Sequence, residues 1–255
     1  MSATVSPELI ARWAEELEGR APGEILAAVA SHFPGKISLA TSFGPEDNLL
    51  LELIARERLP IGAFTLDTGF LFAETYALWA RLEALSGLSV TAVTSDAPRV
   101  VEPGKPAPWL ADPDACCDAR KVKPLRAVLS TLDAWVTGIR REQTPERASA
   151  RVVEWDARFG LVKVNPLVAW TSDEVWSHLK RLEIPFNPLH EQGFSSIGCA
   201  PCTTPVKPGE DPRSGRWRGR EKTECGLHLR AAPSPTLSPA SAGERGDPPG
   251  SGERS

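Results

Sequence analysis

Strand-like and helix-like segments alternate along the first half of the chain, and this alternation is what most constrains the fold. Short, mainly apolar segments predict strands at residues 36–40, 62–67, 88–93 and 134–138. Apolar residues at helical spacing predict helices at about residues 48–58, 73–85 and 117–132. The pattern is typical of an α/β fold with a doubly wound, mostly parallel sheet, whose ligands bind beyond the carboxyl ends of the strands.

The remaining segments complete a division into three parts. Residues 151–155 and 161–164 predict a short hairpin, and residues 172–182 predict a helix started by Thr171 or Ser172. Residues 230–255 consist mostly of Pro, Ser, Gly, Ala and scattered charges, which predicts a disordered tail. We therefore expect an N-terminal helical segment at 1–35, one main domain at 36–229 and the tail.

Composition narrows the possible partners and the location. The chain of 255 residues is 41% hydrophobic and carries a net charge of −4, which argues against nucleic acid or an anionic membrane as a partner held by bulk electrostatics. Its first 20 residues combine acidic side chains with a helical pattern capped by Ser6, unlike a signal peptide. No apolar run approaches the roughly 20 residues needed to cross a bilayer. We expect a soluble, cytoplasmic protein.

The chain has five cysteines, four in two pairs and one alone. The pairs are Cys116-Cys117 and Cys199-Ala200-Pro201-Cys202. An odd count in a reducing compartment fits metal ligation plus a reactive thiol better than disulfides. Both zinc and an iron–sulfur cluster accept four thiolates, but adjacent cysteines do not easily occupy two corners of one small tetrahedron. A cubane spreads its thiolates over separate irons, so geometry favours the cluster over zinc.

The isolated Cys225 is the candidate nucleophile. Its neighbours, Glu224 and Gly226, predict an exposed and mobile position, and a thiolate there would be the attacking species. The alternative is an ordinary surface cysteine. His228 follows three residues later and is assigned a secondary role.

Two further features predict an anion site. The polar turn at residues 41–47 leads into a helix, whose free backbone N–H groups favour an anion, and Ser42, Gly44 and Asp47 suit a close approach. Basic residues gather at Arg120-Lys121, at Arg140-Arg141 with Arg147, and at Arg213 with Arg216. Each group alone is compatible with a solvated surface. Together at one crevice they would hold a compact, multiply charged anion.

Six motifs in order resemble the assimilatory adenylyl-sulfate reductases, over residues from about 36 to 228. They are Ser42-Phe43-Gly44-Pro45-Glu46-Asp47, Leu66-Asp67-Thr68-Gly69, Cys116-Cys117-x-x-Arg120-Lys121, Thr137-Gly138-x-Arg140-Arg141-x-Gln143, Gly198-Cys199-x-Pro201-Cys202-Thr203 and Glu224-Cys225-Gly226-Leu227-His228. The resemblance implies an adenine nucleotide alpha hydrolase-like fold with a C-terminal cysteine-bearing segment. It also implies reduction of adenosine 5′-phosphosulfate to sulfite and AMP, with thioredoxin as electron donor.

Carried over motif by motif, the resemblance assigns a role to each candidate residue. It makes Cys225 the residue that attacks the sulfate sulfur. It implies that a [4Fe-4S] cluster is held by Cys116, Cys117, Cys199 and Cys202. It places Lys121 between cluster and substrate, and the phosphosulfate between Arg147, Arg213 and Arg216. It places Ser42 and Asp47 at the mouth of the substrate site, and Leu66 to Gly69 near the adenosine.

Three other functions remain open at this point. A reductase for the 3′-phosphorylated nucleotide shares the fold and the Glu-Cys-Gly-Leu-His motif, but typical members lack both cysteine pairs. A tRNA-thiolation enzyme of related fold tends to carry a Ser-Gly-Gly-x-Asp-Ser loop, which this chain does not have, and the chain has no basic excess. A zinc or redox sensor would leave Cys225 incidental. The oligomeric state is open, with a homo-oligomer allowed.

Overall fold

A single six-stranded sheet organises the chain, seen in a computed structural model that describes residues 5–222 and 224–227. The spatial order is β3-β2-β1-β4-β6-β5, and every pairing is parallel except that of β5 with β6. The strands are β1 (Ile37–Thr41), β2 (Gly62–Asp67), β3 (Val90–Thr94), β4 (Ala134–Val136), β5 (Val153–Asp156) and β6 (Leu161–Val164). The predicted mostly parallel α/β sheet is confirmed, with the predicted hairpin at its edge.

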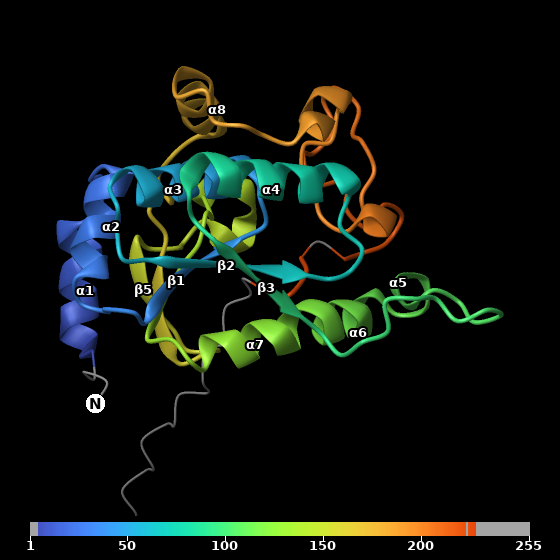
Figure 1. Ribbon diagram of the computed structural model, residues 1–255, viewed down its shortest axis with the longest axis horizontal. Coiled ribbons are helices and arrows are strands. Elements are labelled where there is room, and N and C mark those ends of the chain that lie inside the picture. Colours follow the sequence, from blue (N-terminus) through green and yellow to red (C-terminus); the bar gives the residue numbers. More distant parts are fainter. Residues whose placement is uncertain (1–4, 223, 228–255) are drawn as a thin grey trace, which may run out of the picture.

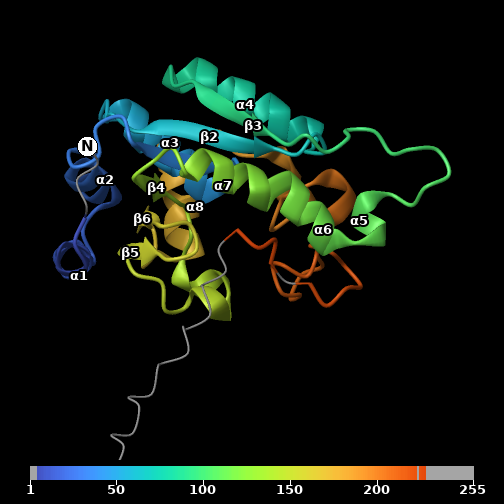
Figure 2. The ribbon, with the colours of Figure 1, turned by 90° about the horizontal axis from the view of Figure 1, so that it is seen from below.

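Helices cover both faces of this sheet (Figures 1 and 2). One face is packed by α3 and α4, the other by α7. The helices are α1 (Pro7–Glu16), α2 (Pro22–Ala30), α3 (Pro45–Arg56), α4 (Ala73–Ser86), α5 (Pro108–Ala111), α6 (Pro113–Cys117), α7 (Lys123–Leu129) and α8 (Ser172–Arg181). Short 3-10 turns add Arg141–Gln143, Pro145–Arg147, Pro188–Gln192 and Ala200–Cys202.

Two hydrophobic clusters hold the layers together. The larger joins α1, α2, α3, α4 and α8 to one face of the sheet, with Leu26, Leu39 and Leu50 fully buried. The smaller packs Leu125 and Leu129 of α7 against Phe64 and Trp135 on the other face. The described residues of the N-terminal segment therefore share the core of the sheet, while the predicted tail at 230–255 lies outside the described residues.

Local sequence explains where the helices begin. Ser6 caps α1 and Thr171 caps α8, each accepting a backbone N–H bond, as predicted. Helix α3 begins at Pro45, three residues before the predicted start, because Pro45 occupies its first turn with Glu46 and Asp47. Acidic residues are favourable beside the positive end of a helix dipole, so this polar stretch is helical rather than a turn.

The helix predicted at 117–132 is interrupted by a π-helical segment, Asp118–Val122, between α6 and α7. Here Lys123 N–H donates to the carbonyl of Asp118, five residues back. Pro124 follows at once; it has no N–H, and its ring excludes the carbonyl four residues earlier from a normal α-turn. The widened turn carries Arg120 and Lys121, both buried, directly after the cysteine pair.

Within the described residues, no helix is both long enough and apolar enough to span a bilayer.

Candidate active site

The loop after β1 binds Asp47 tightly. Ser42 donates to one Asp47 carboxylate oxygen twice, from its backbone N–H at 2.7 Å and from its hydroxyl at 2.9 Å. Burial raises the pKa of Asp47 to about 6, against the effect of these hydrogen bonds. Gly138, after β4, closes the other side, because a Cβ there would lie 2.4 Å from Asp47 Oδ1. Ser42 and Asp47 thus form one rigid unit at the carboxyl edge of the sheet.

The end of β2 joins this edge to the second cysteine pair. Asp67 accepts from the backbone N–H of Gly69 at 2.9 Å and from the Tyr76 hydroxyl at 2.7 Å. Gly69 has φ of +75°, a left-handed conformation that glycine adopts without strain. Leu66 packs in the smaller hydrophobic cluster. The turn that carries two of the predicted nucleotide-binding residues is therefore fixed by Asp67 and its partners.

Thr68 links this turn to the cysteines. Its hydroxyl lies 3.3 Å from Cys199 Sγ, and the Ala200 N–H donates to the carbonyl of Phe70 at 2.7 Å. Burial opposes ionisation of Cys199, but Lys121 and the Thr68 hydrogen bond outweigh it and lower the pKa of the thiol. The resemblance placed Leu66 to Gly69, and with them Thr68, near the adenosine; the contact of Thr68 with Cys199 was not predicted.

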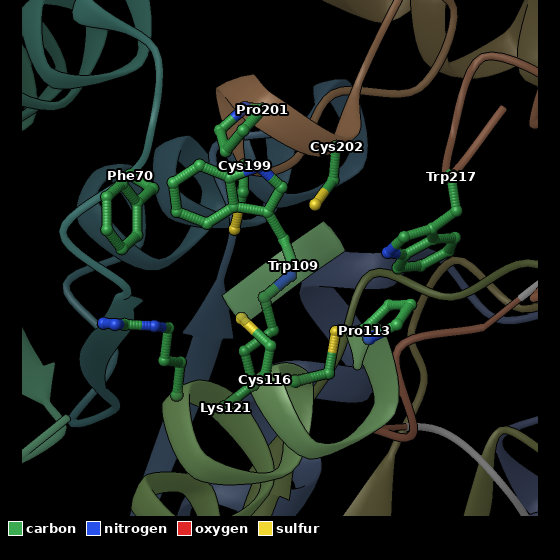
Figure 3. A pocket seen from close by; sticks show the side chains of 11 residues that line it. Phe70, Trp109, Pro113, Cys116, Lys121, Cys199, Pro201, Cys202 and Trp217 are labelled. Carbon is green, nitrogen blue, oxygen red and sulfur yellow. The ribbon is translucent and has the colours of Figure 1, made fainter. Parts of the chain in front are cut away.

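All four paired cysteines line one cavity, shown in Figure 3. The sulfurs of Cys116, from α6, and of Cys199 and Cys202, from the segment 199–202, point into the same space from opposite sides. Its other walls are mostly aromatic and basic side chains: Phe70, Trp109, Pro113, Arg120, Lys121, Pro201 and Trp217. In the part of the chain described, no group of three or more His, Cys, Asp or Glu side chains is arranged to hold a metal ion.

Arg120 and Lys121 are neighbours in sequence with different surroundings. Arg120 donates to the carbonyls of Thr68, at 3.2 Å, and Pro98, and its guanidinium lies 4.6 Å from the centre of the Phe70 ring. Arg120 thereby ties the loops after β2 and β3 to the π-helical segment beside the cavity. Burial alone would lower the pKa of Lys121, but the Cys199 and Cys225 thiols reverse this and raise it. Lys121 therefore stays cationic between the cavity and Cys225.

Cys225 lies among basic side chains. Lys121, Arg147 and Arg216 all interact electrostatically with its sulfur, and so does Cys117 at the edge of the cavity. Burial lowers the pKa of both Arg147 and Arg216, but a guanidinium starts so far above neutral pH that both keep their charge. The half-buried thiol thus faces a concentration of positive charge, which favours the approach of an anion.

Glu224 corrects one sequence-based prediction. We expected this residue to allow exposure beside Cys225, but its side chain is only 6% exposed. One carboxylate oxygen lies 3.0 Å from Arg147 Nη2 and the other 3.1 Å from Arg213 Nη2. The sequence shows a charged residue next to Cys225; it does not show the cations 77 and 11 residues away that bury it.

The predicted basic groups divide between two tasks. Arg140 pairs with Glu46 at 2.8 Å and with Glu142, and Arg141 makes a two-point contact with Glu18 of the N-terminal region. These two arginines brace the loop that precedes Arg147. Lys121, Arg147 and Arg216 gather around Cys225, and Arg213 joins them through Glu224. His228 lies outside the described residues.

Comparison with known proteins agrees with this fold. Residues 36–205 match the family model described as phosphoadenosine phosphosulfate reductase domain. The crystal structure of a phosphoadenylyl-sulfate (PAPS) reductase from Candida auris superposes with a TM-score of 0.70, covering 80% of this chain and all of that one at 24% identity, which shows the fold. The chain belongs to the phosphoadenosine phosphosulfate reductase family.

Curated relatives extend the match to most of the chain. A protein of Mycolicibacterium smegmatis named adenosine 5′-phosphosulfate reductase is 43% identical, covering 87% of this chain and 94% of the relative. One of that name from Allochromatium vinosum is 44% identical, covering 85% and 88%. A relative from Gloeobacter violaceus, 47% identical over 84% of this chain and 91% of its own, is named phosphoadenosine 5′-phosphosulfate reductase.

The raised pKa of Asp47 gives a pH dependence that can be measured. Between about pH 4 and pH 6 the folded protein binds more protons than the unfolded chain, so the free energy of unfolding falls as pH rises, by up to about 3 kcal/mol. Asp47→Asn removes the titrating group and is expected to abolish this fall. Denaturant unfolding at several pH values checks it.

The matched control is Asp173→Asn, which changes an exposed aspartate at the start of α8. Its stability curve is expected to run parallel to that of the wild type. A curve for Asp47→Asn that also parallels the wild type would show that Asp47 keeps an ordinary pKa in the folded protein.

Proposed function

We propose that this protein reduces adenosine 5′-phosphosulfate to sulfite and AMP, as part of assimilatory sulfate reduction leading to cysteine. The observation that carries the proposal is one thiol, Cys225, set among Lys121, Arg147 and Arg216 beside a cavity lined by four other thiols. The names of the relatives from Mycolicibacterium smegmatis and Allochromatium vinosum support it.

The four paired cysteines would hold a [4Fe-4S] cluster. The donor set fits this group: Cys116, Cys117, Cys199 and Cys202 line one cavity, and a cubane takes one thiolate at each iron. The aromatic side chains of Phe70, Trp109 and Trp217 screen the cavity from water. When bound, the cluster would supply fixed charge next to Lys121; electrons for the reaction come from thiols.

The substrate's parts are assigned to three groups of residues. Ser42, in the loop after β1, and Asp47, at the start of α3, would lie at the mouth of the site. Leu66 to Gly69, at the end of β2, would lie near the adenosine. Lys121, Arg147, Arg213 and Arg216 would surround the phosphosulfate. The burial of Lys121 and Arg147 strengthens their charge interactions, because little water screens them.

The chemistry is a displacement at sulfur. The Cys225 thiolate forms a bond to the sulfate sulfur while the bond from that sulfur to the phosphate oxygen breaks, and its electron pair leaves with AMP. Negative charge that builds on the phosphate oxygen is stabilised by cations already held in place, such as Lys121 and Arg216. The products are AMP and an S-sulfonate on Cys225.

Thioredoxin would complete the cycle. One of its thiolates attacks the Cys225 sulfur, which releases sulfite and leaves a mixed disulfide, and its second thiol resolves that disulfide. The two electrons thus come from the thioredoxin dithiol. We further propose a cytoplasmic location and no nucleic-acid or membrane partner.

The 3′-phosphorylated nucleotide is the second candidate substrate. The name of the Gloeobacter violaceus relative favours it. The two cysteine pairs favour the unphosphorylated nucleotide, because typical reductases for the 3′-phosphorylated form lack them. We therefore place adenosine 5′-phosphosulfate first.

We expect Cys225→Ser to bind AMP but to form no covalent adduct, because a serine hydroxyl at neutral pH carries no negative charge for the attack. Mass spectrometry after mixing with substrate, without thioredoxin, checks this. The wild type is expected to gain the mass of one SO₃ group on the peptide that contains Cys225. An adduct of that mass retained by the serine variant would exclude this residue as nucleophile.

We expect the protein purified without air to be brown and to contain iron and acid-labile sulfide in equal amounts. Replacing any one of Cys116, Cys117, Cys199 and Cys202 by serine is expected to remove most of both. Cys225→Ser is the control, since it is expected to keep the cluster. A colourless wild type that holds stoichiometric zinc would contradict the proposal.

We expect adenosine 5′-phosphosulfate to be reduced with the higher kcat/KM when both nucleotides are offered to the same enzyme with reduced thioredoxin. Sulfite release from each nucleotide alone, and from mixtures, measures the ratio. A higher kcat/KM for the 3′-phosphorylated substrate would reassign the chain to the activity in the name of its Gloeobacter violaceus relative.

A further inference from the structure

We infer that Glu224 is a positioning residue that holds the Cys225 thiol in the site by pairing with Arg147 and Arg213. The inference rests on the proposed function, in which Cys225 is the nucleophile. It concerns a carboxylate for which neither the fold nor the chemistry above has a use.

The geometry of Glu224 is that of an anchor. Its two carboxylate oxygens are shared between two guanidinium groups, with Arg147 at 3.0 Å and Arg213 at 3.1 Å. The side chains of Glu224, Arg147 and Arg213 are 6%, 9% and 21% exposed, so water does little to weaken the pairing. Arg147 is itself held by the side chain of Gln143. A charged pair of this kind keeps its strength only while the segment that carries Glu224 stays docked.

The chain on the other side of Cys225 is held as well. Arg158, in the turn between β5 and β6, donates to the carbonyl of Gly226, and Leu227 packs in the smaller hydrophobic cluster. Gly226 has φ of +86°, and a Cβ there would lie 3.4 Å from Val122, so glycine suits this turn. Cys225 is therefore held from both sides, by Glu224 before it and by Gly226 and Leu227 after it.

Charge balance explains why a carboxylate belongs here. Lys121, Arg147, Arg213 and Arg216 bring together four positive charges with little water between them, which is costly without nearby anions. The Glu224 carboxylate supplies one such anion, directly beside Arg147 and Arg213. Glu224 thus offsets part of this positive charge, and it pairs with Arg147 and Arg213 rather than with Lys121 or Arg216.

Arg147 retains a donor for the substrate while it holds Glu224. Its Nη groups contact Gln143 and Glu224, whereas its buried Nε makes no hydrogen bond among the described residues. Anchoring and anion binding are therefore compatible in one closed site. Release of Cys225 to thioredoxin requires that both contacts of Glu224 break.

The test compares Glu224→Gln with the wild type as cluster-loaded protein. Glutamine keeps the shape but not the charge, so the segment is expected to undock more often. We expect iodoacetamide to label Cys225 about tenfold faster or more, read by peptide mass spectrometry without any nucleotide. In a single turnover with adenosine 5′-phosphosulfate, S-sulfonate formation is expected to slow by a similar factor, with the affinity for AMP unchanged.

Two further variants separate positioning from a general loss of structure. Glu221→Gln neutralises an exposed carboxylate three residues earlier and is expected to match the wild type in both rates. Glu224→Asp keeps the charge on a shorter arm and is expected to fall between wild type and Glu224→Gln. The absorbance of the cluster reports whether each variant is folded.

The inference is overturned if Glu224→Gln labels within twofold of the wild type, or if Glu224→Asp labels as fast as Glu224→Gln. It is also overturned if slower S-sulfonate formation comes with a matching loss of AMP affinity, because Glu224 would then support binding. The labelling measurement uses no substrate, so it stands even if the wild type forms no S-sulfonate, which is the result that would refute the proposed function.

Discussion

The site depends on keeping several positive charges out of water at one end of a parallel sheet. Lys121, Arg147 and Arg216 are all deeply placed, and burial works against the charge on each of them. Isolated, such charges would destabilise the fold. They are tolerated because anions or potential anions surround them: the Glu224 carboxylate and the thiols of Cys199 and Cys225. The cysteines and the cations therefore form one electrostatic system, and neither group is explained without the other.

The fold brings this system together from distant parts of the sequence. The loops after β1, β2 and β4 meet at the carboxyl edge of the sheet. There Asp47, Thr68 and Gly138 make the close contacts that hold these loops in place. The two cysteine pairs, more than 80 residues apart, face each other across a cavity because the Ala200 N–H is fastened to Phe70 after β2. Lys222 contacts Asp114 in α6, and Arg220 contacts Leu110 in α5. The segment before Cys225 is therefore held against the helices that lead to Cys116 and Cys117.

The sequence predicts the architecture well and points to residues that the structure brings together, but it does not predict the pairings among them. Hydrophobic periodicity is a local property, so the alternation of strands and helices can be recognised in the sequence. That alternation predicts a parallel sheet. The order β3-β2-β1-β4-β6-β5 depends on long-range packing and was not predicted. Likewise, Arg140 and Arg147 look alike as isolated arginines. Their roles differ because their partners differ. Arg140 pairs with Glu46, 94 residues away, and braces a loop, whereas Arg147 pairs with Glu224 next to Cys225.

The π-helical turn at Asp118–Val122 sets the angular phase between α6 and α7. Each residue of an α-helix advances about 100° around the axis, so an insertion or deletion there would not merely lengthen or shorten the helix. It would rotate the Cys116-Cys117 pair relative to α7, which stays fixed by its packing on Trp135. This stretch is therefore far less tolerant of length variation than of substitution, although it lies within continuous helix.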